Sequence, residues 1–156
     1  MQIGPITADF APFLATDSLR LYRRAGTGDC LVLSLSGVGK DFSAWPPLEF
    51  VKYANASPQH HFLFASDRNR SWLNDEALAE TLCAEVQGYA AAHGLARIVT
   101  LGNSMGGFMA LALAPLLGPK RRLPSARSSR LTPRWCRKSG AGSSSAAGSR
   151  PFATAT

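Results

Sequence analysis

Short apolar runs bounded by turn-forming residues predict the strands of a small sheet. Residues 31–35 (LVLSL), 61–65 (HFLFA) and 97–101 (RIVTL) are each mostly apolar and are followed by turn-forming residues. Strands of this kind are buried on both faces, as in parallel sheets covered by crossover helices. Residues 19–24 (LRLYRR) instead alternate between apolar and polar positions, which predicts a strand with one solvent-facing side.

Two helices are predicted between and after these strands. In residues 75–93, apolar side chains recur at spacings of three and four, which is typical of an amphipathic helix. Asn74 or Asp75 can cap its first turn, and Gly94 can adopt the left-handed conformation that ends it. Residues 105–117 predict a second, apolar helix. The resulting order of strand, helix and strand indicates a right-handed parallel crossover.

Charge divides the chain at Gly118. The 156 residues carry a net charge of +7, yet residues 1–118 hold eight basic and ten acidic side chains, whereas residues 119–156 hold nine basic and no acidic ones. The second segment is dominated by Arg, Ser, Ala, Pro and Gly, a composition that cannot bury enough apolar surface to offset chain entropy. We therefore expect one domain over residues 1–118 and a disordered, basic, low-complexity tail over residues 119–156.

Two explanations fit the abrupt change after Gly118. A shifted reading frame would replace the strand that is due there with unrelated sequence. The alternative is a noncatalytic binding or interaction protein whose basic tail contacts nucleic acid, because nine positive charges attract phosphates. The arginines are scattered and lack interleaved aromatic residues, so no specific nucleic-acid partner is expected.

Targeting signals and membrane spans are not apparent in the sequence. The first basic residue is Arg20 and no compact apolar run follows a charged N-terminus, so no secretory signal is expected. The longest apolar stretch, residues 108–117, contains Pro115 and has about half the roughly 20 residues that a spanning helix needs. The three cysteines form no C-x-x-C pair, which favours reduced thiols and a cytoplasmic location.

The motif with the clearest chemical meaning lies between the strand at residues 97–101 and the helix at residues 105–117. It is a G-x-S-x-G sequence with a further glycine after it: Gly102, Asn103, Ser104, Met105, Gly106 and Gly107. In a strand–turn–helix context this pattern predicts a nucleophile elbow, in which small neighbours allow a tight turn that exposes the serine hydroxyl. The backbone N–H of Met105 would be one donor to an oxyanion.

On this motif the chain resembles the α/β-hydrolase superfamily over most of residues 31–118. The resemblance implies a partial α/β-hydrolase fold, with a short, mostly parallel sheet flanked by helices. It also implies hydrolysis of a small acyl or carboxylic-ester substrate by Ser104, without a cofactor. The second oxyanion donor would lie in residues 36–39 (SGVG), where we expect the Val38 N–H, although Ser36 replaces the family's usual histidine.

A second loop adds to the resemblance. Residues 67–71 (DRNRS) follow a predicted strand and are similar to a diverged form of the superfamily's Asp-Arg-Gly loop. This similarity bears on the fold more than on the chemistry.

The partners of a catalytic serine are missing downstream. In the superfamily the order along the chain is serine, acid, histidine. Here the last carboxylate is Glu85 and the last histidine is His93, so neither role can be filled after Ser104, and we expect the printed chain to be inactive or nearly so. His60, His61 and His93 are predicted to lie far from Ser104, and neighbouring side chains on a strand point to opposite faces, which disfavours a zinc site.

Two nucleotide-binding motifs are disfavoured. Residues 35–41 look like a phosphate-binding loop, but Ser34 replaces its first glycine and Asp41 follows Lys40, where a carboxylate repels phosphate. The elbow is no dinucleotide site, because Ser104 stands at the required second glycine.

Trp45 could line an acyl pocket. Finally, without further strands, residues 98–101 would form an exposed apolar edge prone to self-association.

Overall fold

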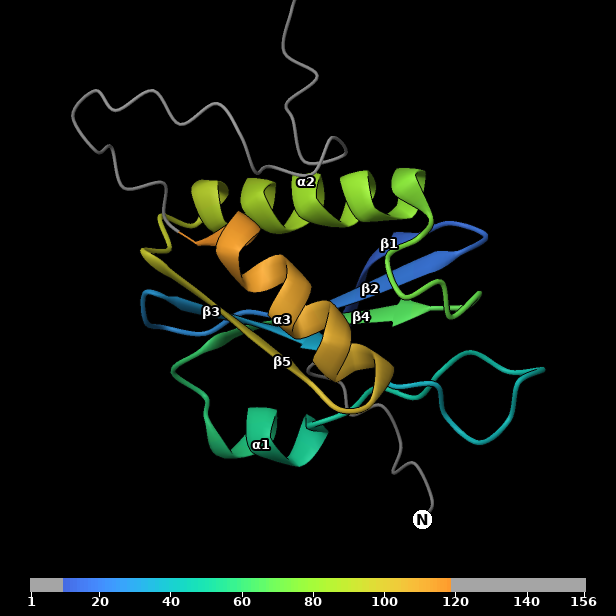
Figure 1. Ribbon diagram of the computed structural model, residues 1–156. Helices are drawn as coiled ribbons and strands as arrows, with labels where there is room; N and C mark the ends of the chain where they lie inside the picture. Colours follow the sequence, from blue (N-terminus) through green and yellow to red (C-terminus); the bar gives the residue numbers. More distant parts are fainter. Residues whose placement is uncertain (1–9, 119–156) are drawn as a thin grey trace, which may run out of the picture.

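The computed structural model describes residues 10–118 as a sheet with three helices (Figure 1). In chain order the elements are β1 (Ala11–Ala15), β2 (Leu19–Arg24), β3 (Cys30–Leu35), α1 (Val51–Ala56), β4 (His61–Asp67), α2 (Glu76–Ala92), β5 (Arg97–Gly102) and α3 (Met105–Leu117). The four strands and two helices predicted from the sequence are confirmed as β2, β3, β4, β5, α2 and α3. The predicted tail, residues 119–156, lies outside the described residues.

The five-stranded sheet is mixed, with the order β1-β2-β4-β3-β5. β3 is parallel to both β4 and β5, whereas β2 is antiparallel to both β1 and β4. The expected mostly parallel sheet of a partial α/β-hydrolase fold is therefore wrong, because half of the four strand pairings are antiparallel. Alternating apolar and polar positions identify β2 as a strand but are the same for either direction.

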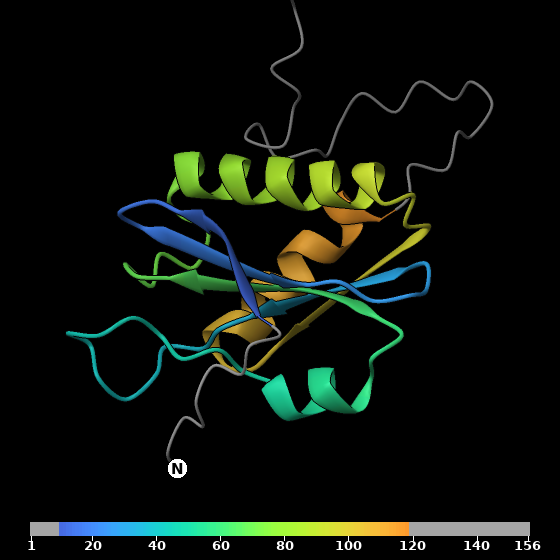
Figure 2. The ribbon, with the colours of Figure 1, turned by 180° about the vertical axis from the view of Figure 1, so that it is seen from behind.

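The antiparallel part of the sheet begins with a hairpin that the sequence analysis missed. Only residues 16–18 connect β1 to β2, a length that permits an antiparallel turn but no crossover (Figure 2). The Leu19 N–H donates to the Thr16 hydroxyl across this turn at 2.9 Å. β1 itself (APFLA) shows no regular alternation of buried and exposed side chains, so its sequence pattern did not predict a strand.

The two faces of the sheet carry separate cores. α2 and α3 cover one face, where Leu33 and Leu63 are fully buried, and α1 lies on the other (Figures 1 and 2). On the α1 side, Phe62 and Phe64 stack with ring centroids 5.8 Å apart and pack with Ala54. Because side chains alternate along a strand, β4 supplies leucine to one core and phenylalanine to the other.

The ends of α2 follow the sequence prediction. Of the two candidate caps, Asp75 takes the role: its carboxylate accepts a hydrogen bond from the Leu78 N–H at 3.0 Å. Asn74 instead donates from its side chain to the Ser71 carbonyl at 2.9 Å. Beyond the helix, Gly94 has φ +64°, the left-handed conformation expected there.

β5 lies at one edge of the described sheet, as predicted. Its only partner among residues 10–118 is β3, and Val99 is 48% exposed. The neighbouring α3 also presents apolar side chains to solvent, since Phe108 is 52% and Leu111 80% exposed. The edge is therefore apolar, and self-association through it stays a prediction.

Candidate functional site

Ser104 occupies the turn between β5 and α3. Its backbone has φ 54° and ψ −122°, a combination that an L-residue rarely adopts and that costs about 1–3 kcal/mol. The side chain is exposed, and its hydroxyl makes no capping hydrogen bond to α3. A strained, exposed serine between a strand and a helix is the arrangement that the G-x-S-x-G motif predicts.

Two of the three predicted elbow glycines are required by close backbone contact. A Cβ atom on Gly102 would collide with the Gly106 carbonyl group and would lie 2.7 Å from the Gly107 nitrogen. A Cβ atom on Gly106 would collide with the carbonyl of Leu35 at the end of β3. At Gly107 the nearest atom, the Gly102 carbonyl oxygen, would be 3.3 Å away, so this position has more room. The glycines thus seat the first turn of α3 directly on the ends of β3 and β5.

The predicted oxyanion loop lies beside the elbow. Leu35 pairs with Gly102 in the sheet, so the residues that follow each of them emerge together. A Cβ atom on Gly37 would lie 3.1 Å from the Asn103 carbonyl oxygen. Val38 follows and is partly buried against the main core.

Both predicted oxyanion donors come from this region. Met105 is the first residue of α3, where backbone N–H groups lack an intrahelical acceptor. Within residues 10–118, no hydrogen bond engages the Val38 N–H. The two N–H groups therefore belong to adjacent turns at the carboxyl ends of neighbouring strands, and their role as oxyanion donors stays a prediction.

Arg70 holds the loop that follows Val38. Its Nε donates to the Val38 carbonyl at 3.0 Å, and its Nη2 donates to the carbonyls of Asp41 and Ala44, each at 2.9 Å. The same guanidinium also donates to the Phe42 carbonyl at 3.4 Å. Arg70 belongs to the predicted 67–71 loop, but its contact with Val38 was not predictable, because the two residues are about 30 positions apart along the chain.

The loop after β4 is shaped by Asp67, the first residue of the predicted 67–71 loop. This carboxylate is 2% exposed and accepts hydrogen bonds from the Asn69 N–H at 3.0 Å, the Ser71 N–H at 2.6 Å and the Ser71 hydroxyl at 2.8 Å. Further along, Trp72 has φ 55° and places its ring 5.6 Å from that of Phe108, in the first turns of α3. Phe108, four residues after Ser104 in the sequence, thus forms an aromatic pair with Trp72.

A carboxylate that the sequence analysis overlooked lies on the other side of Gly37. Glu49 Oε1 accepts a hydrogen bond from the Gly37 N–H at 3.2 Å. Partial burial raises the pKa of the Glu49 carboxyl, and the Gly37 N–H opposes that rise. Nothing in the sequence around Glu49 signals this contact, because the segment before α1 has no regular pattern.

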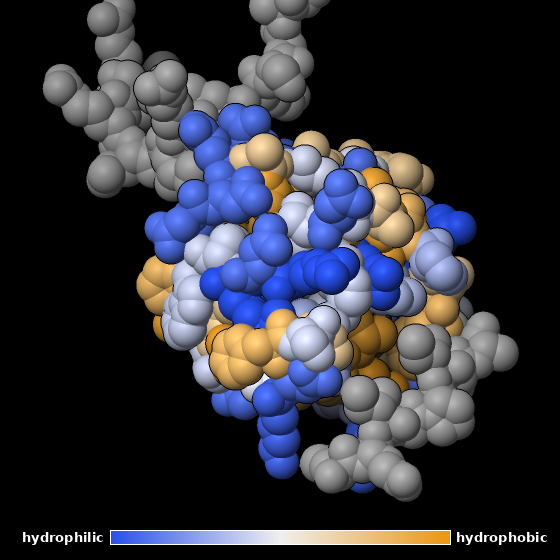
Figure 3. All heavy atoms as spheres, turned by 90° about the vertical axis from the view of Figure 1, so that its right-hand side faces the viewer, coloured by the Kyte–Doolittle hydropathy of each residue, from blue (hydrophilic) through white to orange (hydrophobic). Residues whose placement is uncertain are grey.

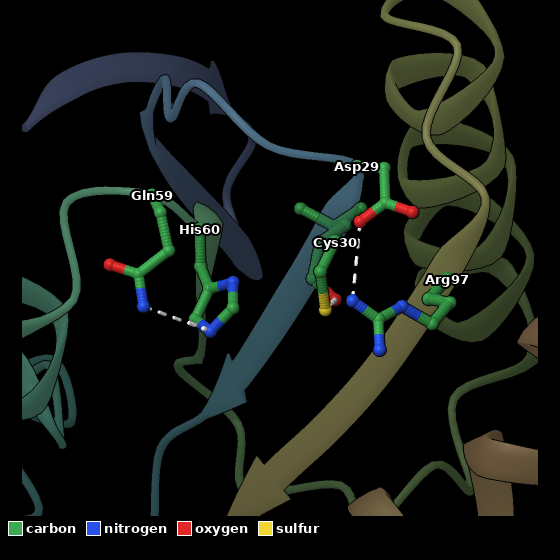
Figure 4. Close-up of polar contacts among 6 residues, drawn as sticks. Asp29, Cys30, Gln59, His60 and Arg97 are labelled. Carbon is green, nitrogen blue, oxygen red and sulfur yellow. Dashed lines mark hydrogen bonds and ion pairs between the residues drawn. The ribbon is translucent and has the colours of Figure 1, made fainter.

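The three histidines lie at the opposite end of the sheet, as predicted. His61 begins β4 and pairs with Leu31 near the start of β3, while His93 caps the end of α2. Figure 4 shows His60 beside Gln59 at this end, near the ion pair between Asp29 and Arg97, whose nitrogen and oxygen are 3.2 Å apart. Because parallel strands share their amino ends, none of these imidazoles reaches the turn at Ser104.

Two sequence candidates are explained by structural roles. Ser36, which stands where the expected resemblance would place a histidine, is buried and donates to the Pro47 carbonyl at 2.8 Å. Trp45, a candidate for the acyl pocket, is covered by the guanidinium of Arg20, whose Cζ lies 4.1 Å from the ring centroid, and by that of Arg68 at 5.6 Å. Cation–π contacts hold this indole against the sheet.

The phosphate-loop alternative lacks its helix. After Lys40 the chain continues without a helix until α1, so this loop does not lead directly into a helix as a phosphate-binding loop does. The Asp41 carboxylate instead accepts hydrogen bonds from the Ser43 N–H at 2.8 Å and the Ser43 hydroxyl at 2.6 Å, and these bonds lower the pKa of the Asp41 carboxyl.

The molecular face onto which the loops after β3 and β4 project is mainly hydrophilic, with hydrophobic patches (Figure 3).

Comparison with known proteins gives no relative on which to base a function. No family model, curated protein or solved structure matches this chain. Among the helices of residues 10–118, none has the length and apolar character required to cross a membrane. In the same part of the chain, no three histidine, cysteine, aspartate or glutamate side chains converge as metal ligands.

Proposed function

We propose that residues 10–118 carry the nucleophile and the oxyanion donors of a serine acyl-transfer site that accepts small carboxylic esters. The observation that carries this proposal is the backbone of Ser104, held at φ 54° and ψ −122° between a strand and a helix. Strained backbone of this kind persists where the surrounding structure enforces it, and it clusters at functional sites. The resemblance to the α/β-hydrolase superfamily is supported by this elbow alone and stays a prediction.

The chemistry follows from the groups at the turn. Ser104 Oγ attacks the ester carbonyl carbon, a C–O bond forms, and the carbonyl electron pair moves to the oxygen. The N–H groups of Met105 and Val38 stabilise that oxyanion, helped by the positive end of α3 behind Met105. When the intermediate collapses, the bond to the leaving oxygen breaks, the alkoxide takes a proton from solvent to leave as an alcohol, and the acyl group stays on Ser104. Hydrolysis by water then returns the serine and releases the carboxylic acid.

Proton transfer limits this site. A serine hydroxyl is a weak nucleophile unless a neighbouring base accepts its proton. In the described part of the chain the histidines lie at the other end of the sheet, so solvent must accept the proton of Ser104. We therefore expect stoichiometric acylation or phosphonylation of Ser104 with little or no turnover.

A fluorophosphonate probe tests the proposal. The intact 156-residue chain should be labelled at Ser104, as located by peptide mass spectrometry, and Ser104→Ala should lose that label. Ser43→Ala is the matched control, because Ser43 is also exposed, lies in a nearby loop and should not affect labelling. Absence of labelling in the unchanged chain, or equal labelling of Ser104→Ala, would contradict the proposed function.

A further inference from the structure

The segment that carries Glu49 is fixed to the sheet by three buried serines. Ser34 Oγ donates to the Glu49 carbonyl at 2.9 Å, Ser36 Oγ to the Pro47 carbonyl at 2.8 Å, and Ser66 Oγ to the Pro46 carbonyl at 2.8 Å. These serines are at most 3% exposed. Buried hydroxyls that each find an acceptor hold the connection between β3 and α1 close to the sheet.

This anchoring places a carboxylate against the predicted oxyanion loop. A Cβ atom on Gly37 would lie 2.9 Å from Glu49 Oε1 and 3.1 Å from the Asn103 carbonyl oxygen, so both Glu49 and the elbow lie close to Gly37. The Gly37 N–H donates to Glu49 Oε1 at 3.2 Å, and the Val38 carbonyl, which follows the Gly37 carbonyl along the chain, accepts from Arg70 Nε at 3.0 Å. The peptide that carries the Val38 N–H is therefore fixed at both ends.

We propose that Glu49 is a positioning residue: its carboxylate holds Gly37 so that the Val38 N–H points to the oxyanion formed at Ser104. This inference rests on the proposed function. Donors stabilise an oxyanion most when they are already oriented before the reaction. A carboxylate suits the task because a charged acceptor binds a backbone N–H more strongly than a neutral one.

Partial burial of Glu49 is consistent with this role. The pKa of its carboxyl is raised chiefly by desolvation, while the bond from Gly37 lowers it. Side chains whose pKa is shifted by partial burial are common at functional sites. The structure shows the Glu49 carboxylate in contact with the Gly37 N–H, so the role assigned to it in this scheme is positioning and not proton transfer.

Two substitutions at one position separate positioning from proton transfer. Glu49→Gln keeps an acceptor oxygen for the Gly37 N–H, whereas Glu49→Ala removes it. Fluorophosphonate labelling of the intact chain should be roughly 10- to 100-fold slower in Glu49→Ala, which is less than the loss of a whole oxyanion donor, and within about threefold of the unchanged chain in Glu49→Gln. If Glu49→Gln is as slow as Glu49→Ala, the reaction needs the negative charge of Glu49 and not only an acceptor for the Gly37 N–H, and the positioning role as stated is wrong.

A second reaction separates positioning from general folding. In the Ser104→Cys background, alkylation by iodoacetamide forms no oxyanion, so its rate at position 104 reports only the exposure and reactivity of the turn. Adding Glu49→Ala should leave this alkylation rate unchanged. An equal fall in the alkylation and phosphonylation rates would show that Glu49 supports the turn itself, which overturns the inference.

The contact can also be tested without any reaction at Ser104. The amide proton of Gly37 should shift with pH as the Glu49 carboxyl titrates, and this shift should vanish in Glu49→Gln. An amide that does not titrate overturns the inference. If the amide titrates but the chain takes no label, the contact exists while the proposed function fails, so the positioning role is wrong as well. If labelling occurs and Glu49→Ala labels normally, only the positioning role fails.

Discussion

The two ends of the parallel strands differ in how their polar groups are used. At the amino ends, His61 Nδ1 lies 3.1 Å from the Tyr89 hydroxyl, and the rings of Tyr89 and His93 stack with centroids 4.1 Å apart. At the carboxyl ends, Ser104 is strained and its hydroxyl makes no capping bond, and the Val38 N–H donates to no residue of the described chain. The end that holds the histidines is thus an end whose polar groups already have partners.

This difference separates polar groups that serve the fold from polar groups that remain available for the proposed chemistry. Imidazoles at the amino ends are bonded or stacked, so they fill space and satisfy neighbours. The carboxyl ends keep backbone donors and a hydroxyl available by forcing tight turns, as in open α/β sheets, where ligands bind beyond the carboxyl ends of strands. Unused hydrogen-bonding capacity is a better guide to a site here than a cluster of histidines.

The largest effect is expected from Gly106→Ala, which disturbs the contact between the first turn of α3 and the end of β3. The added Cβ would collide with the Leu35 carbonyl, and backbone on both sides prevents easy relief. We expect a loss of about 4 kcal/mol or more in the free energy of unfolding, measured by urea denaturation, or failure to fold.

Gly107→Ala is the matched control. Its Cβ would meet the Gly102 carbonyl oxygen at 3.3 Å, a contact that a small shift can relieve. We expect a change well below that of Gly106→Ala, offset in part by the better helix propensity of alanine, worth about 1 kcal/mol. Equal effects at both positions would show that the close approach of α3 to β3 is not what requires glycine.

Two carboxylates, one at each end, sharpen the comparison. Asp67 at the carboxyl end is buried and accepts three hydrogen bonds. In Asp67→Asn the side-chain NH₂ would face a backbone N–H, so we expect a loss of about 2 kcal/mol in the free energy of unfolding. The Asp29 carboxylate at the amino end is 60% exposed in its pair with Arg97, and Asp29→Asn should cost no more than about 0.5 kcal/mol. Similar costs in urea denaturation would contradict this contrast.

The parts of the fold and of the candidate site that depend only on neighbouring residues could be predicted from the sequence. The elbow was predictable because a strand pattern, a G-x-S-x-G motif and a helix pattern follow one another within residues 97–117. Met105 as the first helical residue followed from the same local pattern. The cap at Asp75 was narrowed to two candidates for the same reason, and only the structure showed that Asn74 bonds elsewhere.

Features that join distant segments were not predictable. Strand direction in β2 depends on its pairing with β4, more than 40 residues later, and one alternating pattern serves both directions. Likewise, Glu49 reaches Gly37 only because buried serines on β3 and β4 hold its segment. Arg70 reaches Val38 across two loops. No local spacing encodes these contacts, so the parts that complete the site were missed.

The smallest expected effect concerns protonation at the amino end. Burial lowers the pKa of the His61 imidazole below its ordinary value of 6.5, and the nearby His93 lowers it further. As the pH falls below 6.5, the unfolded chain therefore binds a proton at His61 before the folded chain does, and stability declines. In His61→Phe this contribution is absent, so the stability advantage of the unchanged chain should shrink between pH 8 and pH 5, as measured by urea denaturation at each pH. An advantage that grows as the pH falls would mean that the folded state favours protonated His61, and that the amino end, like the carboxyl end, holds an unsatisfied group.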